Sequence, residues 1–321
     1  MGSAHGTSAL IDDVLERGSF CYAAATTPLG PHVTPMVFAP AGGRLWVTTS
    51  RDSVKASAWA RDDRVAGLVR AGEDAVLFTG HVSTFDLLRP ESWGRSLREA
   101  PALAVAAARF TAKNARFFGG YAVDANHVPL AWTPPGRVFA SLALDAVARL
   151  EGDRLAEHRG WVSAPTTRNG AERFRAVRTG RGPLEGLPAD VRDRLGSAGA
   201  GALALEGASG PVVLPARWAV QDAGIYAIVA EEVLDLATTE PGPVALTIDR
   251  PAGWRASEMI GAMVRGSAEV AVASRLVSGL TSARRIARSA GTDVAGSAIV
   301  RVSPRSLVWW RGWSSGTVAL P

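Results

Sequence analysis

An internal repeat constrains the fold of this chain more than any other feature of its sequence. Four short motifs of the first half recur in the second half in the same order, at offsets of 177, 178, 180 and 180 residues. The motifs begin at Asp13, Gly18, Gly30 and Leu45, and their counterparts begin at Asp190, Gly196, Gly210 and Ile225. Because both the order and the spacing are kept, the sequence predicts a tandem duplication. The length of 321 residues is enough for two domains of ordinary size.

The two copies show the same series of expected helices and strands. A short amphipathic helix comes first, at about 8–17 in one copy and 188–195 in the other, and a strand, a Gly/Pro turn and a hairpin follow. The later elements expected in the first copy are hairpin arms at about 32–39 and 44–49, a helix at 53–60, strands at 64–70 and 75–82, a helical stretch at 90–116 and a closing strand at 137–144. In the second copy we expect strands at about 243–248 and 260–270, a helix at 272–289, and final strands at 297–302 and 306–311.

The series of elements indicates the fold class. Many short strands with few long helical crossovers favour an antiparallel barrel in each copy. We therefore expect a mainly β fold with α (α+β), built as two tandem barrels. The first barrel is expected at 1–150, a connector rich in Arg, Gly and Thr at 151–186, and the second barrel at 187–321. Such a chain is a pseudodimer within one polypeptide, so a monomer or a weak homodimer is expected.

The positive charge of the chain comes almost wholly from arginine. Two of the 35 basic residues are lysines, Lys55 and Lys113, and this bias is typical of proteins from GC-rich bacteria. The formal net charge of +5 is spread along the chain without a basic run, so no nucleic-acid partner is expected. No stretch of 18 apolar residues occurs, so no membrane-spanning helix is expected either.

Cysteine and histidine usage narrows the classes of protein further. Cys21 is the single cysteine, which excludes an intrachain disulfide and suits a reducing cytoplasm. The N-terminal segment carries Asp12, Asp13 and Glu16 where a signal peptide would be basic, so a cytoplasmic protein is expected. None of the five histidines has another histidine three or four residues away, and no metal site is expected.

The segment 45–55 carries the clearest sign of chemistry. After an apolar start it contains three hydroxyl residues, two cations and a further serine as a helix begins. These residues are Thr48, Thr49, Ser50, Arg51, Ser53 and Lys55. Hydroxyl groups, cations and the free N–H groups of a helix N-terminus together favour a phosphate site. The alternative is an N-capped surface helix with a solvated lysine.

The same region resembles a known family between about residues 8 and 82. The matching stretches are Pro31-His32-Val33-Thr34-Pro35-Met36-Val37-Phe38, Leu45-Trp46-Val47-Thr48-Thr49, Ser53-Val54-Lys55 and Asp63-Arg64-Val65-Ala66. They resemble the FMN-binding split barrels, the pyridoxamine 5′-phosphate oxidase-like superfamily of flavin and deazaflavin oxidoreductases. The stretch Pro135-Gly136-Arg137-Val138-Phe139 is similar to the family's last strand. One departure is Ala58, which stands where many members carry an asparagine.

The resemblance implies a six-stranded split barrel that holds FMN, or a deazaflavin coenzyme, in a groove between two barrels. It also implies an oxidoreductase that acts on a small-molecule substrate. The implied ligands of the cofactor phosphate are Thr48, Thr49, Ser50, Arg51, Ser53 and Lys55. Val33, Thr34 and Pro35 are implied to line the flavin ring. No acid/base pair stands out in the sequence, so no catalytic residue is assigned.

The second copy departs from this pattern. Its counterpart of the phosphate segment is 228–235, where the cations are replaced by Glu231, Glu232 and Asp235. Carboxylates repel a phosphate, so we expect one phosphate site, in the first copy, and a degenerate second barrel. Trp309 and Trp310 are candidates for a wall against the flavin ring, with ordinary packing as the alternative.

Two other functions remain open at this point. A haem-binding or haem-degrading split barrel needs an axial ligand, for which His32 and His81 are the nearest candidates. A non-catalytic protein with a degenerate groove that binds a ligand or a partner is the second alternative. The fold alone does not choose among these functions.

Overall fold

The computed structural model describes residues 8–86, 88–129, 136–161, 174–176, 180, 182–207, 209–237, 242–251 and 255–320. Contacts within the chain divide it into two compact units. Unit 1 comprises Met1–Thr26 and Pro35–Trp161, and unit 2 comprises Thr27–Thr34 and Val162–Pro321. The short segment Thr27–Thr34 therefore packs with the second half of the chain, although its neighbours in sequence belong to the first.

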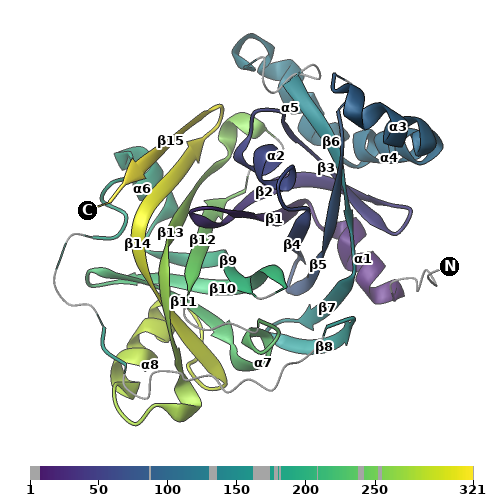
Figure 1. Cartoon of the computed structure of the whole chain (residues 1–321). Coiled ribbons are helices and arrows are strands. Elements are labelled where there is room, and N and C mark those ends of the chain that lie inside the picture. The colour runs from purple at the N-terminus through teal and green to yellow at the C-terminus, as the bar shows by residue number, and fades with distance from the viewer. Residues whose placement is uncertain are drawn as a thin grey trace. The chain divides into compact units, whose positions relative to one another are not determined.

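Unit 1 is built on a closed barrel (Figure 1). Its strands are β1 (Phe20–Thr27), β2 (Gly30–Ala41), β3 (Arg44–Ser50), β4 (Arg64–Ala71), β5 (Asp74–Phe85) and β6 (Arg137–Ala143). They pair in the order β4-β1-β2-β3-β6-β5, and the pairing of β4 with β5 closes the ring. Strands β7 (Ala146–Glu151) and β8 (Arg154–Arg159) extend the sheet beyond β5.

Unit 2 repeats the same barrel. Its strands are β9 (Ala198–Gly207), β10 (Gly210–Gln221), β11 (Gly224–Ala230), β12 (Pro243–Arg250), β13 (Ile260–Val272) and β14 (Ser297–Arg311). The circular order β12-β9-β10-β11-β14-β13 matches that of unit 1 strand for strand, and β15 (Ser314–Ala319) is added beside β14. This order confirms the two tandem barrels and the α+β class predicted from the sequence.

Backbone details also repeat between the units. The N–H of Arg51 donates to the carbonyl of Gly136 at 2.9 Å, and the N–H of Glu231, 180 residues later, donates to Gly296 at 2.8 Å. Gly80 in β5 and Gly266 in β13 are a second such pair. A Cβ atom at either glycine would overlap a backbone carbonyl oxygen of the neighbouring strand, that of Ala143 or Ser303. Both barrels therefore require glycine at this point of close approach.

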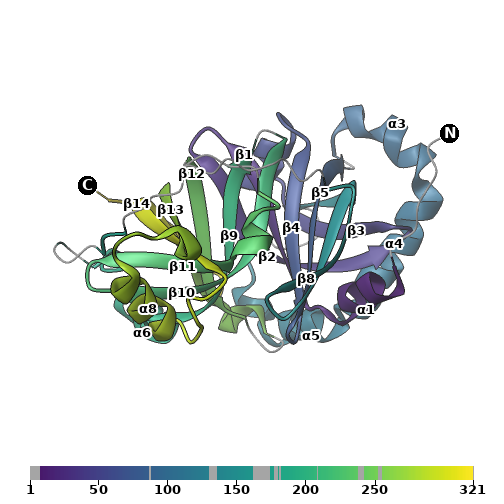
Figure 2. The ribbon, with the colours of Figure 1, turned by 90° about the horizontal axis from the view of Figure 1, so that it is seen from below.

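The helices cover the outside of the barrels. In unit 1 they are α1 (Ala9–Arg17), α2 (Val54–Trp59), α3 (Pro90–Arg98), α4 (Ala100–Lys113) and α5 (Ala115–Val123), with a 3-10 turn at Ala125–His127. Figure 2 shows α3 and α4 outside the strands of this barrel. In unit 2 they are α6 (Ala189–Leu195), α7 (Glu231–Leu234) and α8 (Leu280–Ser289), with 3-10 turns at Ala256–Glu258 and Ala273–Arg275. In the described part of the chain, no helix is both long and apolar enough to cross a membrane.

Several expected elements differ from the structure. The helical stretch expected at 90–116 is three helices. Glu99 separates α3 from α4, and Asn114, whose side chain donates to the carbonyls of Phe38 and Phe110, separates α4 from α5. The two final strands expected at 297–302 and 306–311 are one strand, β14. A β-bulge accommodates Pro304 there, which is why the apolar pattern is interrupted without a loop.

The expected connector begins inside unit 1. Residue 150 lies in the β7–β8 hairpin, so strand pairing of the first unit continues past the expected boundary. Most of the expected connector after Trp161 lies outside the described residues. The helix expected at 272–289 begins later, at Leu280, after a 3-10 turn.

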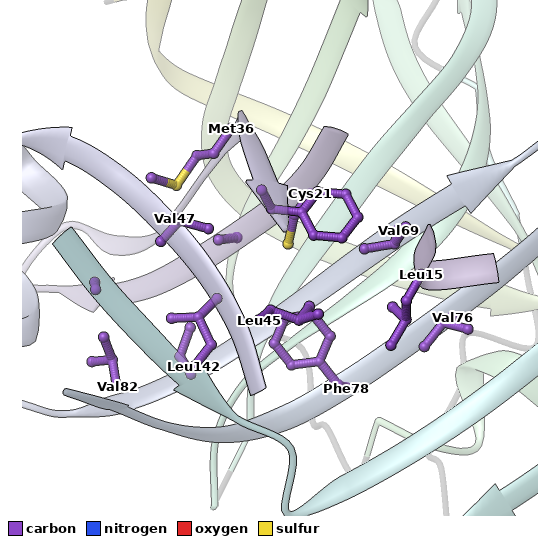
Figure 3. Close-up of a cluster of buried hydrophobic side chains, with 14 of the residues drawn as sticks. Leu15, Cys21, Met36, Leu45, Val47, Val69, Val76, Phe78, Val82 and Leu142 are labelled. Carbon is purple, nitrogen blue, oxygen red and sulfur yellow. The ribbon is translucent and has the colours of Figure 1, made fainter. Parts of the chain in front are cut away.

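The core of the first barrel depends on close packing around β4. Gly67 lies between Cys21 on β1 and Phe78 on β5, and a side chain at Gly67 would overlap the Phe78 ring. Cys21, Leu45 and Phe78 are fully buried and meet in the cluster drawn in Figure 3. Among the described residues, side chains thus fill the interior of this barrel.

Candidate functional site

The end of β3 gathers the hydroxyl residues that the sequence singled out. Thr49 is 7 % exposed, and its hydroxyl lies 2.9 Å from that of Ser53. Ser53 also caps α2, since its oxygen accepts the N–H of Ala56 at 3.0 Å. The α2 helix has six residues, so its dipole adds little, and any affinity of this loop for an anion must come from its hydroxyl groups and cations.

Arg51 is held by a carboxylate that the sequence analysis did not identify. Its guanidinium donates two hydrogen bonds to Asp86, at 2.8 and 2.7 Å. Burial alone would raise the pKa of the Asp86 carboxyl, but the hydrogen bonds and the charge of Arg51 bring it below its ordinary value. Asp86 is 5 % exposed, so the pair is well placed to fix the loop but offsets the charge of Arg51.

Arg137 is a third cation at the loop, beside Arg51 and Lys55, and the sequence analysis did not assign it. It opens β6 and lies opposite Ser50 in the strand pairing. Its guanidinium donates to the carbonyl oxygen of Thr48 at 2.7 Å and to the Thr48 hydroxyl at 2.8 Å. Burial lowers the pKa of Arg137, although a guanidinium stays protonated. The loop therefore has a cation fixed against a residue predicted to bind phosphate.

Lys55 lies in the interior and not in solvent. Its side chain is 3 % exposed, and desolvation lowers its pKa from 10.5 to about 7. The Cys21 thiol is near enough to interact with it electrostatically, and burial raises the pKa of that thiol to about 12. The alternative of a solvated surface lysine is therefore wrong. The predicted contact of Lys55 with a phosphate stays a prediction.

The residues predicted to line a flavin ring are divided between the two units. Val33 and Thr34 belong to unit 2, and Pro35 belongs to unit 1. Val33 is fully buried. Its N–H donates to the sulfur of Met263 at 3.3 Å, and its carbonyl accepts the hydroxyl of Thr247 at 2.5 Å. The backbone of Val33 is thus held within unit 2, and its role toward a ring stays a prediction.

The two histidines proposed as haem ligands differ in their surroundings. The His81 side chain is 58 % exposed, and its Nδ1 lies 2.6 Å from a carboxylate oxygen of Asp145. His32 is 9 % exposed and belongs to the segment that packs with unit 2. An axial ligand lies in an apolar pocket, whereas the His81 side chain is exposed.

Trp309 and Trp310 cannot both form one wall. Successive residues of a strand point to opposite faces of the sheet, and these two are neighbours on β14. The Trp309 ring covers Gly316 of β15, and the Trp310 ring covers Gly261 of β13. Packing over a glycine of the adjacent strand explains the position of each ring, and at most one tryptophan can face a given ligand.

The equivalent loop of unit 2 has different chemistry. Strand β11 runs directly into α7 at Glu231, and no side chain caps that helix. The Glu231 carboxylate accepts the hydroxyl of Ser274 at 3.0 Å. Ser297 stands at the position of Arg137, since it pairs with Ala230 as Arg137 pairs with Ser50. The backbone is therefore repeated, and the cations are not.

No group of three or more His, Cys, Asp or Glu side chains among the described residues is placed to hold an ion.

Comparison with other proteins gives likenesses to solved structures. No family model matches the chain, and no curated protein matches it. A pyridoxamine 5′-phosphate oxidase-related, FMN binding protein from Nostoc punctiforme is 17 % identical, covering 47 % of this chain and 87 % of its own, with a TM-score of 0.34. A conserved hypothetical protein from Mycobacterium tuberculosis is 22 % identical over 46 % of this chain and 85 % of its own, with a TM-score of 0.33. A heme binding protein from Mycobacterium smegmatis is 15 % identical over 48 % of this chain and 58 % of its own, also with a TM-score of 0.33. Similarity at this level says nothing about what this chain binds.

Proposed function

We propose that the protein binds a flavin, FMN in the first instance, and acts as a flavin-dependent oxidoreductase on a small-molecule substrate. The observation that carries the proposal is the loop of unit 1, where Arg51, Lys55 and Arg137 accompany the hydroxyl groups of Thr48, Thr49 and Ser53. Cations and hydroxyl groups are the donors that a phosphate monoester needs. The resemblance of the surrounding sequence to the FMN-binding split barrels selects FMN among phosphorylated ligands.

The donor set fits the cofactor phosphate in kind. Arg137 and the two hydroxyl groups of Thr49 and Ser53 would hold the phosphate. Lys55, whose pKa is about 7, would add a charge from the buried side in its protonated form. Arg51 would fix the loop through Asp86. When bound, the flavin supplies the redox chemistry, and the protein binds it, orients it and excludes water.

A titration with FMN and riboflavin tests the phosphate site, because the two differ by the phosphate alone. Flavin fluorescence and the visible spectrum report binding to the full chain. We expect FMN to bind at least about tenfold more tightly than riboflavin, as a charge-assisted contact to a phosphate requires. In Arg137→Gln this difference should shrink, whereas Arg217→Gln, an exposed arginine on β10, should keep it. Equal affinities for FMN and riboflavin in the wild type would contradict the proposal.

Two further titrations separate the alternatives. A deazaflavin coenzyme titrated beside FMN identifies which ring system the protein prefers. Addition of haem tests the other ligand class, for which a Soret band that is lost in His32→Ala is the expected signature. Tight flavin binding without turnover by common electron donors would identify a non-catalytic binding protein.

A further inference from the structure

The strands β12, β13 and β14 of unit 2 lie side by side (Figure 1), and one of their faces has an unusual composition. Residues paired across antiparallel strands share a face, and every second residue along a strand does so. The register places Ala245, Arg265 and Ser306 in one row of this face, and Thr247, Met263 and Val308 in the next. Gly261 and Trp310 form a third row. We name this surface the Arg265 face.

Arg265 is a buried cation for which the described residues provide no ion-pair partner. It is 9 % exposed, and its Nε is buried with no hydrogen-bond partner. Among the residues that the structure describes, no carboxylate forms an ion pair with it. Burial lowers the pKa of Arg265, and no neighbouring charge opposes that effect. The buried Nε is unfavourable for the fold, because its lost hydration is not replaced by a hydrogen bond.

Another arginine on the pair β13–β14 has the ion-pair partner that is usual for a partly buried arginine. Arg301 on β14 lies opposite Glu269 on β13 and is bonded to its carboxylate. Asp249 is a carboxylate on the same face, and it lies beside Gly261 in the register. Four strand residues separate the rows of Gly261 and Arg265, about 13 Å at the usual rise. Asp249 is therefore not the partner that Arg265 lacks.

The barrel itself does not require an arginine at this position. Gly80 and Gly266 are equivalent, so Thr79 of unit 1 corresponds to Arg265. The first barrel closes in the same strand order with a threonine there. Since the equivalent barrel folds without it, the arginine is explained better by binding than by folding.

The surroundings of Arg265 are already fixed in place. Thr247 and Met263, one row away, hold the backbone of Val33 on this face. Pro243, two residues before Ala245 on β12, lies against Gly30 of the same segment. Trp310 presents its ring on the same face over Gly261. A cation held among such groups is pre-organised, so little ordering is needed when a ligand binds.

We propose that Arg265 binds the carboxylate or phosphate group of a small anionic ligand on the Arg265 face. A planar guanidinium accepts either group through two parallel hydrogen bonds. The proposal concerns residues of unit 2 alone, and it is tested without flavin. It gives the second barrel a binding role although its own phosphate loop has lost the cations.

Calorimetric and thermal titrations of the full chain without flavin test the proposal. Inorganic phosphate and succinate serve as probes, with sodium chloride at matched ionic strength as the control. We expect one of the two probes to bind and to raise the melting temperature of the wild type. Arg265→Gln should weaken that probe at least tenfold, whereas Arg217→Gln should leave its affinity unchanged. The probe that binds identifies the class of anion.

Two results would overturn the proposal. One is an equal response of the wild type and Arg265→Gln to phosphate and to succinate. The other is no response beyond that to chloride in the wild type. Arg265→Lys covers the case in which the glutamine variant fails to fold, since it keeps the charge but loses the two-bond geometry and should bind the probe less tightly. A protein that binds succinate or phosphate but no flavin would refute the proposed function and leave this inference intact.

Discussion

The two barrels share one strand order but differ at the loop that follows the third strand. In unit 1 this loop carries Arg51 and the buried Lys55, and in unit 2 the same positions hold Glu231 and the exposed Asp235. The backbone hydrogen bond at Arg51 is nevertheless repeated at Glu231. The comparison shows that the backbone of a duplicated barrel can be kept while its charged side chains diverge. Mutations can therefore test the shared backbone of the two barrels and the different charged residues of their loops one at a time.

The largest expected effect concerns what the two barrels share. Gly80→Ala or Gly266→Ala would drive a Cβ atom into a backbone carbonyl of the neighbouring strand. A backbone carbonyl in a paired strand cannot move aside as a flexible side chain can. We therefore expect a loss of at least about 3 kcal/mol of unfolding free energy in each case. Urea denaturation followed by circular dichroism measures it. Gly94→Ala, in helix α3 with open space around it, should be neutral or slightly stabilising. If either barrel tolerates the alanine, the close approach is not a shared requirement.

The next effect concerns Lys55, which is buried where Asp235 is exposed. Above pH 7 the folded protein holds Lys55 neutral, while the unfolded chain keeps its lysine protonated up to about pH 10.5. The unfolded state then binds more protons, so stability rises with pH, by on the order of 2 kcal/mol between pH 7 and 8.5. Lys55→Met should remove this rise and be more stable than the wild type at pH 7. Urea titrations at the two pH values measure both quantities.

Asp235→Asn provides the matched control for that experiment. Asp235 is exposed, so its replacement should change stability by less than about 0.5 kcal/mol and leave the pH dependence intact. The Cys21 thiol, with its pKa raised to about 12, stays protonated in the folded state across this range. A wild-type slope that survives in Lys55→Met would show that Lys55 is not the titrating group.

The third prediction transfers the chemistry of the second loop into the first. Arg51→Glu gives unit 1 the residue that unit 2 has, and it places two carboxylates together at Asp86. We expect FMN affinity to fall roughly thirtyfold, which is about 2 kcal/mol, because a fixed cation is replaced by an anion. Fluorescence titration measures the affinity. The double variant Arg51→Glu/Asp86→Arg restores an ion pair and should recover stability. Unchanged FMN affinity in Arg51→Glu would remove this loop from the phosphate site.

The sequence was sufficient for the barrels because each strand is a local apolar pattern and the repeat supplied the grouping. The sequence was not sufficient to predict which residues form hydrogen bonds with the loop that follows β3. Asp86 is 35 residues from Arg51, and Arg137 is 89 residues from Thr48. Strand order brings them together, and no local pattern encodes strand order. The stretch containing Arg137 was matched to a closing strand, but its contact depends on the pairing of β6 with β3.

The burial of the Lys55 side chain could not be predicted from the sequence for a different reason. Hydrophobicity favours a buried Val54 and a solvated Lys55, whereas the structure exposes Val54 by 49 % and buries Lys55. A helix of six residues has too few positions to define an apolar face. The two strands predicted at 297–302 and 306–311 also differ from the single strand of the structure, because a proline inside a strand usually marks its end.

The smallest expected effect concerns the cap of α2, which α7 lacks. Ser53→Ala removes the acceptor for the Ala56 N–H and the hydrogen bond to Thr49. We expect a loss of about 1 kcal/mol in unfolding free energy, and Ser53→Thr should recover most of it. Val233, the equivalent residue in unit 2, makes no cap there, but it is buried, so its replacement would report packing and not capping.

FMN affinity separates the two roles of Ser53. If the hydroxyl serves the helix alone, Ser53→Ala lowers the melting temperature and leaves the ratio of FMN to riboflavin affinity unchanged. If it also serves the phosphate, that ratio falls with it.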